Sequence, residues 1–357
     1  MKQRSTLATV LLYLISAVVV ILSLYPFVYA ISTSLKTGNA LFTADLLPSN
    51  ADLRNYRALF EGVQPFGKSL VNSIVVCFLT VAFAMLMGTG WNDVFWSGLL
   101  GLLVYGFVYR AERSTRMAEV LEPFATIVCA IAACAIARID PNINIPVVIL
   151  SSIIIFIPGL ALTLGLAELA ARDLISGTAR IMDASMLLFK LYFGAVLGMA
   201  IGKAFFGEAI YIEPEGLPRW AIWSAVPILS MALVFIFKAR MQDSPWGVLA
   251  GIVAFFSAML GGHFFGDSVG IFFGALAVGV YSNLYARWMK APASIALLQG
   301  IVILVPGSKT YIGLNALISG ETMLNQSHIG SQIFLIFMSL IAGLIFANVV
   351  VPPRRTL

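Results

Sequence analysis

The chain has 357 residues, of which 60% are hydrophobic and 11% are charged, and its mean hydropathy is +0.95. A soluble domain needs about 25% charged residues to stay dissolved, so this composition excludes a soluble enzyme. The net charge of +5 does not indicate nucleic-acid binding, because the Lys and Arg residues lie in short connections between apolar runs and form no basic patch.

Apolar stretches recur along the whole chain, and a membrane-spanning helix needs roughly 20 such residues. They lack the alternation of barrel strands, and only helices or closed barrels satisfy their backbone in lipid. We therefore predict an all-α membrane bundle of about 11 helices. The predicted spans are 8–31, 69–89, 94–110, 118–138, 145–166, 183–203, 219–237, 246–263, 268–286, 293–317 and 331–351.

The first predicted span follows Lys2 and Arg4 and could pass for a signal peptide. Its apolar run is too long for one, so we interpret it as a retained helix. The longest polar stretch, 32–68, comes next and contains a short amphipathic segment at Leu53–Phe60. The other connections are short, so no soluble domain of useful size is expected.

Basic residues in the connections predict the orientation, because Lys and Arg favour the cytoplasmic side of a membrane protein. From residue 88 onward, one set of alternate connections is rich in them: Arg110, Arg113, Arg116, Arg172, Arg180, Lys238, Arg240, Arg287, Lys290, Arg354 and Arg355. The opposite set holds Arg138, Lys203, Arg219 and Lys309. This bias predicts a cytoplasmic C-terminus, although it leaves the basic start of span 8–31 on the outside.

Two segments match at a spacing of 148 residues: Ile157-Pro158-Gly159-Leu160 and Val305-Pro306-Gly307-Ser308. Upstream, Trp96-Ser97-Gly98 through Gly101 loosely resembles Trp246-Gly247 through Gly251. A repeat unit of five helices, an odd number, requires that the second copy is inverted in the membrane. We therefore predict an N-terminal segment at 1–82 and two five-helix inverted repeats at 83–210 and 211–357.

Each Pro-Gly pair predicts a broken helix. Proline removes a backbone donor and glycine loosens the helix, so the second half presents free N–H groups and a positive dipole end at Gly159 and Gly307. Such an end suits a carboxylate. The alternative is that Pro and Gly merely kink these helices, but two copies at equivalent places favour a binding site.

Polar residues follow both breaks and complete the predicted substrate site, because polar groups at membrane depth are costly. Lys309 and the half-helix ends would hold a carboxylate, whereas hydroxyl and amide side chains would bind a substrate hydroxyl. Lys309 could instead extend to a lipid headgroup. The predicted substrate-binding residues are Pro158, Gly159, Thr163, Pro306, Gly307, Ser308, Lys309, Thr310 and Asn315.

Three further ionisable residues are candidates for coupling transport to an ion. Asp183 and Lys190 are seven residues apart and share one helix face. Asp173 is a third candidate, although it could simply end a helix at the cytoplasmic side. Gln299 and Asn283 are interpreted as hydrogen-bonding residues between helices rather than as ligands.

No motif in the chain indicates catalysis, a metal site or a cofactor. The three cysteines lie in apolar runs without CxxC or Cys/His spacing, and no nucleophile elbow, Walker loop or HExxH motif is present. His263 and Asp267 flank a tight connection, which could be a proton relay but reads more simply as a surface turn. The prediction is a transporter and not an enzyme.

From about residue 83 to the C-terminus, the chain resembles the threonine/serine exporter family. The resemblance lies in Met87-Gly88-Thr89-Gly90-Trp91-Asn92-Asp93, Ile157 to Thr163, Asp173-Leu174-Ile175-Ser176-Gly177 with Ala179-Arg180, and Val305 to Tyr311. It implies a ten-helix secondary transporter in a bacterial inner membrane that exports threonine and serine with the proton gradient. Small amino acids, protons and membrane lipid would be its partners, and it could form a homo-oligomer.

Two alternatives remain open. Relatives split into two chains resemble dicarboxylate exporters, and Lys309 with Lys190 would suit a succinate-like substrate. Residues 1 to about 80 are similar to the start of a sugar-type ABC transporter permease, so an ABC subunit or a non-functional hybrid is also conceivable. That likeness ends before the loop by which such permeases bind their ATPase. It lies in Leu24-Tyr25-Pro26-Phe27, Ser32-Thr33-Ser34-Leu35-Lys36, Asn55-Tyr56 and Asn72-Ser73-Ile74-Val75.

Overall fold

The computed structural model describes residues 24–38, 51–61, 66–88, 90–208, 212, 216–305 and 329–353. All regular elements in these ranges are helical, which confirms the predicted all-α class. By its internal contacts the chain divides into two units, Met1–Val71 and Asn72–Leu357.

The first unit is held together by side chains of α2 (Arg54–Glu61). Asn55 Nδ2 donates hydrogen bonds to the carbonyl oxygens of Ser34 (2.9 Å) and Lys36 (2.8 Å), at the end of a helical stretch at 24–34. The hydroxyls of Ser34 and Tyr56 lie 2.6 Å apart. Helix α2 confirms the predicted amphipathic segment, whereas most of predicted span 8–31 lies outside the described residues.

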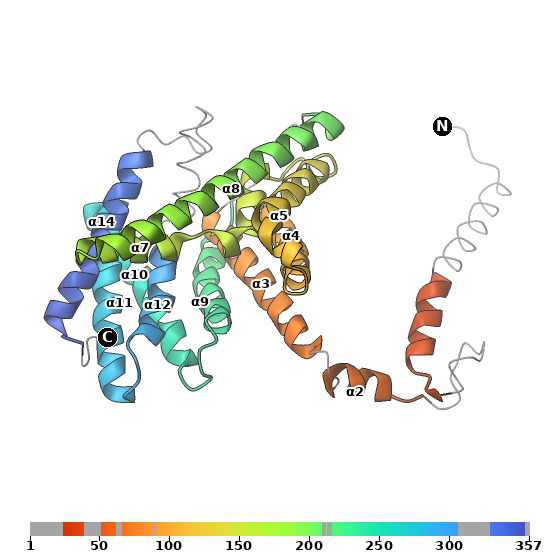
Figure 1. Cartoon of the computed structure of the whole chain (residues 1–357), viewed down its shortest axis with the longest axis horizontal. Helices are drawn as coiled ribbons and strands as arrows, with labels where there is room; N and C mark the ends of the chain where they lie inside the picture. The colour runs from red at the N-terminus through yellow and green to blue at the C-terminus, as the bar shows by residue number, and fades with distance from the viewer. Residues whose placement is uncertain are drawn as a thin grey trace. The chain divides into compact units, whose positions relative to one another are not determined.

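The first half of the large unit follows the predicted order of spans (Figure 1). Its helices are α3 (Phe66–Met87), α4 (Trp91–Ala111), α5 (Thr115–Ile136), α6 (Ile145–Ser152), α7 (Gly159–Ala170) and α8 (Leu174–Phe206). Predicted span 145–166 is split into α6 and α7, and α8 begins nine residues before the predicted start at 183.

The second half repeats this order. Its helices are α9 (Arg219–Ile236), α10 (Ser244–Phe265), α11 (Asp267–Met289), α12 (Ser294–Leu304) and α14 (Ile329–Val350). Predicted span 293–317 is described only as far as residue 305.

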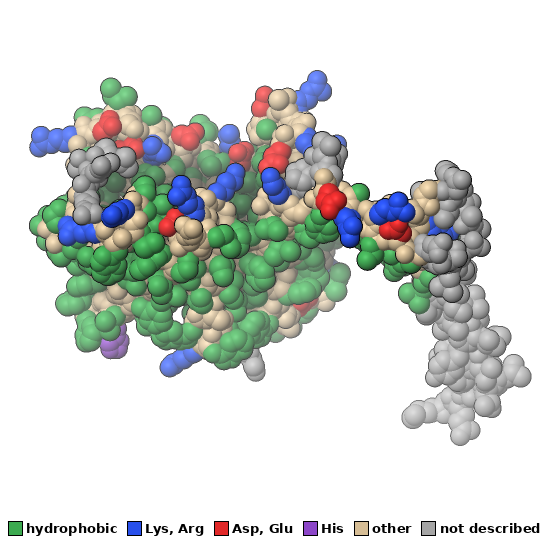
Figure 2. Space-filling view, turned by 90° about the horizontal axis from the view of Figure 1, so that it is seen from below, with side chains coloured by type: hydrophobic (Ala, Val, Ile, Leu, Met, Phe, Trp, Pro, Cys, Tyr) green, Lys and Arg blue, Asp and Glu red, His purple; other side chains and the backbone are tan. Residues whose placement is uncertain are grey.

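Eight of the described helices are long and apolar enough to cross a membrane, and the bent pair α6–α7 adds a ninth. The chain is therefore a multi-pass membrane protein, and the total of 11 spans stays a prediction. Figure 2 shows a broad hydrophobic band on one face of the molecule, with Lys, Arg, Asp and Glu gathered along one of its edges.

The two halves of the large unit pack in the same way. Helix α4 contacts α5 and α6, and α5 contacts α6 and α8. In the second half α10 contacts α11 and α12, and α11 contacts α12 and α14. The internal repeat predicted from two short motifs thus extends to the order of five spans in each half and to the packing of four of their helices. The inversion of the second copy stays a prediction from that odd number.

Glycines allow the closest approach between helices α5 and α8. A Cβ added at Gly198 would lie 2.6 Å from Ala130 Cβ and 2.6 Å from the carbonyl oxygen of Ile127. One turn before and after, Gly194 and Gly202 face α5 equally closely. Small residues at this spacing are how membrane helices bring their backbones together.

Three helices end on a basic residue in the left-handed conformation: Arg172 (φ 66°), Lys238 (φ 51°) and Lys290 (φ 54°). At the end of α9, the N–H of Ala239 bonds to Val234 O and that of Lys238 bonds to Phe235 O, both at 3.0 Å. This is the Schellman pattern, in which glycine is the usual left-handed residue.

Replacing Lys238 with glycine should stabilise the fold by about 0.5–1 kcal/mol, because glycine adopts this conformation without the clash of a Cβ. Thermal unfolding of the detergent-purified protein measures the gain. The control is Lys203→Gly in the last turn of α8, which should lower stability by about 1 kcal/mol because its backbone is helical. An equal loss in both variants would contradict the strain at Lys238.

Candidate functional site

The first helix break lies between α6 and α7. After α6 the chain makes one 3-10 turn at Ile154–Phe156, and Ile157 is then extended (φ −68°, ψ 119°). The residue before a proline is forced out of the helical region, so Pro158 fixes this break. Helix α7 starts at Gly159, and the segment Ile154–Ala170 that contains it is bent by 53° from α6. This confirms the predicted broken helix.

The start of α7 leaves backbone donors available. Pro158, its N-cap residue, has no side chain that could cap the helix. The N–H of Gly159 is used locally, since it donates to Ile157 O at 2.9 Å, and Leu162 N–H bonds to Pro158 O at 3.0 Å. Within the described chain, the N–H groups of Leu160 and Ala161 make no hydrogen bond. Two donors therefore point out of the positive end of the helix.

The second repeat begins its break in the same way. Helix α12 ends at Leu304, and Val305 is extended (φ −64°, ψ 129°). Val305 thus has nearly the backbone conformation of Ile157, its counterpart 148 residues earlier, and each precedes a proline. The continuation of this break, from Pro306, lies outside the described residues.

The described sides of the two breaks lie against each other. Helix α7 contacts both α12 and α14. Leu160, in the first turn of α7, and Val305 pack against one buried cluster that contains Leu304. Before the breaks, Ile155 and Ile303 likewise pack against a shared cluster. The end of α12 therefore lies beside the first interruption.

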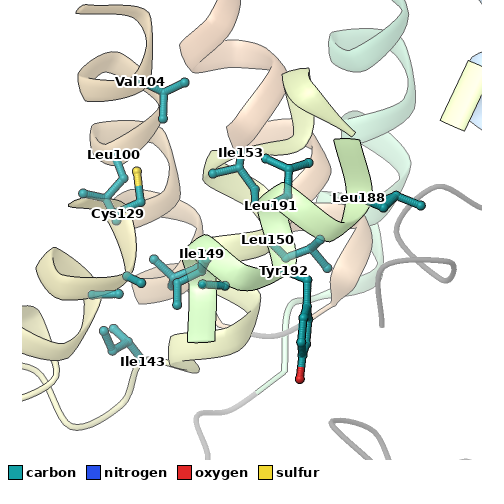
Figure 3. Close-up of a cluster of buried hydrophobic side chains, with 14 of the residues drawn as sticks. Leu100, Val104, Cys129, Ile143, Ile149, Leu150, Ile153, Leu188, Leu191 and Tyr192 are labelled. Carbon is teal, nitrogen blue, oxygen red and sulfur yellow. The ribbon is translucent and has the colours of Figure 1, made fainter. Parts of the chain in front are cut away.

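The helix that leads into the first break is in the interior of the bundle. Residues 147–152 of α6 are all buried. In Figure 3, Ile149, Leu150 and Ile153 pack among side chains of α4, α5 and α8, such as Leu100 and Leu191. At the break itself, residues 154–158 are half-buried, and Gly159 is buried.

The structure describes four of the other predicted site residues. Thr163 is buried, and its hydroxyl donates to Gly159 O (3.1 Å) at the start of α7. Asp173 is the N-cap of α8 and accepts from Ser176 N–H (3.4 Å), as expected for a helix end. Asp183 and Lys190 lie on the exposed side of α8 and not at the breaks. Outside the described residues lie Pro306, Gly307, Ser308, Lys309, Thr310 and Asn315.

Asn283 and Gln299 differ from each other, although both were interpreted as hydrogen-bonding residues between helices. Asn283 Nδ2 donates to Asn348 Oδ1 (3.0 Å) and to Val351 O (2.8 Å), which confirms that role. Gln299 is only 1% exposed, and neither its Nε2 nor its Oε1 has a hydrogen-bond partner in the described chain. For Gln299 the interpretation is wrong, because α10 presents Gly247 to it and no polar group.

Two buried serines in the first repeat were missed by the sequence analysis. Ser97 of α4 and Ser151 of α6 are fully buried, and their hydroxyls have no partner among the described residues. A buried polar group without a hydrogen bond costs about 1–3 kcal/mol. The signal that could have identified them was the loose match of Trp96-Ser97 to Trp246-Gly247.

Two buried carboxylates occupy matching positions at the starts of α4 and α10. Asp93 accepts hydrogen bonds from Asn144 N–H (2.7 Å), just before α6, and from Gly90 N–H (3.3 Å). Asp243 accepts a hydrogen bond from the Tyr285 hydroxyl (2.7 Å). Asp93 precedes Ser97 by one helical turn, and Asp243 precedes Gly247 by the same interval.

Comparison with known families gives two matches, one in each half of the chain. Residues 61–202 match the sequence model of a threonine/serine exporter family, and residues 221–350 match a second model described as Threonine/Serine exporter, ThrE. The first match begins inside segment 1–82. The likeness of residues 1–80 to a permease stays a prediction.

Several curated relatives of the chain are named as yeast membrane proteins. Pheromone-regulated membrane protein 10 of Eremothecium gossypii is 30% identical over 58% of this chain and 28% of its own length. Its namesake in Saccharomyces cerevisiae S288c is 27% identical over 69% of this chain and 67% of its own length. In Candida albicans SC5314 the identity is 30%, over 66% of this chain and 22% of the relative. No solved structure matches the chain.

Proposed function

Because the chain belongs to the threonine/serine exporter family, we propose that it is a secondary transporter that exports threonine, serine or a similar small hydroxy amino acid. It would act as a carrier and not as an enzyme. The observation that carries this proposal is the contact of α7, which follows the first proline break, with α12 and α14 of the second repeat. Secondary transporters bind their substrates at such repeat interfaces.

The residues divide into two roles. The free N–H groups of Leu160 and Ala161 at the start of α7 support binding of the substrate carboxylate. In the second repeat, Gly307 and Lys309 would do the same. Thr163, Ser308, Thr310 and Asn315 would bind the substrate hydroxyl. Of these, Thr163 keeps an accepting oxygen available, since its own proton goes to Gly159 O.

Efflux of labelled threonine from proteoliposomes tests the proposal. The wild-type protein should export threonine, and Lys309→Ala should reduce efflux about tenfold, because one charged hydrogen bond contributes roughly 1.5 kcal/mol or more. The matched control is Lys203→Ala, whose exposed ammonium lies 3.8 Å from Glu208 at the end of α8. Threonine efflux that Lys309→Ala leaves unchanged would count against this site.

Two further arms of the same experiment address the driving force and the substrate. We propose proton coupling on the strength of the family resemblance, so an imposed pH gradient should accelerate efflux and a protonophore should abolish the acceleration. Excess succinate separates amino-acid export from dicarboxylate export. Competition by succinate as strong as that by serine would favour the dicarboxylate alternative.

The proposed orientation places the C-terminus and the basic ends of α7, α9 and α11 in the cytoplasm. These three helices run in the same direction if each intervening helix crosses the membrane once. Each ends on a basic residue, which supports this orientation by the distribution of positive charge. The test is a reporter enzyme that works only outside the cytoplasm, fused to the C-terminus. Activity of this reporter would show that the C-terminus is outside and would contradict the proposed orientation. The bacterial inner membrane also stays a proposal, since the relatives above are from yeasts.

A further inference from the structure

Gln299 is wedged against the backbone of the neighbouring helix. Helices α10 and α12 contact each other, and a Cβ added at Gly247 would overlap the Gln299 amide. The amide is thus enclosed at a closed helix pair, although neither end of it has a hydrogen-bond partner in the described chain. Because the amide is buried, water cannot supply the missing hydrogen bonds while α10 and α12 are in contact.

The first repeat has unpartnered polar groups at the same two positions. Ser151 of α6 corresponds to Gln299 at the spacing of 148 residues that also relates Pro158 to Pro306. Ser97 of α4 corresponds to Gly247 at a spacing of 150 residues. Both serines are fully buried, and α4 contacts α6 as α10 contacts α12.

Within the described part of the large unit, the unpartnered groups are confined to these positions, and Ser32 and Thr33 of the first unit are the others in the described chain. Ser152, directly after Ser151, donates its proton to Val148 O at 2.6 Å. Ser230 and Ser282 also bond to carbonyl oxygens one turn earlier, at 2.8 and 2.7 Å. In the described part of residues 72–357, the buried side chains without a partner are Ser97, Ser151 and Gln299. The missing hydrogen bonds therefore occur at repeat-related positions and are not a general property of buried serines in this unit.

A buried carboxylate lies one helical turn before each of the two α4 and α10 positions, and Arg240 lies near the Asp243–Tyr285 pair. Asp93 lies one turn before Ser97, and Asp243 lies one turn before Gly247, and both carboxylates are buried. The C-terminal ends of α6 and α12, which lead into the breaks, add negative dipole ends. These surroundings attract an ammonium group and repel a second carboxylate.

We propose that the α4–α6 and α10–α12 contacts close the substrate path on its two sides, and that Ser97, Ser151 and Gln299 bind the ammonium and hydroxyl groups of an amino acid when these contacts open. The inference rests on the proposed function and adds subsites for the ammonium and hydroxyl groups of the amino acid, which a dicarboxylate could not use. Ser151 and Gln299 each precede their proline by seven residues, which is about 10 Å along a helix. They are therefore subsites on the way to the breaks, and the breaks hold the carboxylate.

Stability and transport should respond in opposite directions when Gln299 is replaced by leucine. The variant removes a buried polar group that has no partner, so the unfolding temperature of the purified protein should rise by a few degrees. Its KM for threonine efflux should increase at least tenfold. A Gly247→Ala variant should displace the same amide and impair transport similarly. Ser151→Ala is the equivalent test in the first repeat.

The controls are Ser152→Ala and Gly106→Ala. Ser152 has a hydrogen-bond partner, and a Cβ added at Gly106 would meet no atom within 4 Å, so both should keep the wild-type KM. A lower unfolding temperature with unchanged KM in Gln299→Leu would show a structural role and overturn the proposal.

A thermal-shift measurement separates this inference from export itself. Threonine should raise the unfolding temperature of the wild-type protein but not that of Gln299→Leu, whereas succinate should shift neither. If wild-type proteoliposomes export nothing and threonine still gives this difference, the proposed export fails and the binding role of Gln299 holds. An equal threonine shift in both proteins, or a succinate shift as large as that of threonine, would overturn the inference.

Discussion

Replacing Pro158 with alanine should lower threonine efflux about 100-fold. Alanine restores the backbone N–H and releases Ile157 from its extended conformation, so α6 and α7 can join into one straight helix. The free N–H groups of Leu160 and Ala161 would then bond within that helix. Losing two hydrogen bonds to a carboxylate at roughly 1.5 kcal/mol each corresponds to a factor of about 100.

A second proline provides the control for this substitution. Pro227 lies inside α9, which continues through it from Arg219 to Ile236 without a break. Pro227→Ala should therefore leave efflux near the wild-type rate. Proteoliposome efflux, with the unfolding temperature measured in parallel, distinguishes a lost site from a misfolded protein. Full activity in a well-folded Pro158→Ala variant would show that the break is not needed.

Replacing Gly198 with leucine should prevent stable folding of the large unit. A side chain at this position would meet the backbone of α5 at Ile127 O, 2.6 Å from the new Cβ, and a backbone cannot rotate away as a side chain can. Overpacking of a close contact costs about 1–3 kcal/mol or more, and leucine adds three carbons beyond the Cβ. The amount of monodisperse protein on size-exclusion chromatography measures the effect.

Gly198→Ala should give an intermediate loss, since it introduces the Cβ alone. Gly106→Leu is the matched control, because α4 has open space at that position. It should be recovered in wild-type amounts, and its unfolding temperature should not fall. If Gly198→Leu and Gly106→Leu were recovered equally, the close approach of α5 and α8 would not limit folding.

The sequence predicts the membrane helices well because their apolar runs are long and the connections short. It also identifies the break at Pro158, since proline acts through local geometry. The start of α8 was missed, because residues 174–182 contain several polar side chains typical of a loop. In the structure Asp173 caps that segment, and the helix begins at Leu174. A cap becomes visible only when the following backbone is known to be helical.

Partners across helices are harder to predict than the helices themselves. The spacing of Asp183 and Lys190 correctly gives a shared face, but not the direction of that face, which is exposed. For Gln299, the sequence shows a polar residue inside a span. It does not show that the residue opposite is Gly247, which has no side chain to accept or donate a hydrogen bond. Such pairings depend on the tertiary packing of segments far apart in sequence.

The basic residues that end α7, α9 and α11 impose a compromise on this protein. At each of these turns a glycine would relax the backbone, yet in the proposed orientation glycine would also remove a positive charge that keeps the turn in the cytoplasm during insertion. Selection for thermal stability by glycine at these three positions would thus remove the positive charges that determine the membrane topology. We therefore expect stabilising substitutions in this protein to accumulate elsewhere, at positions where a single residue does not determine both the backbone strain and the membrane topology.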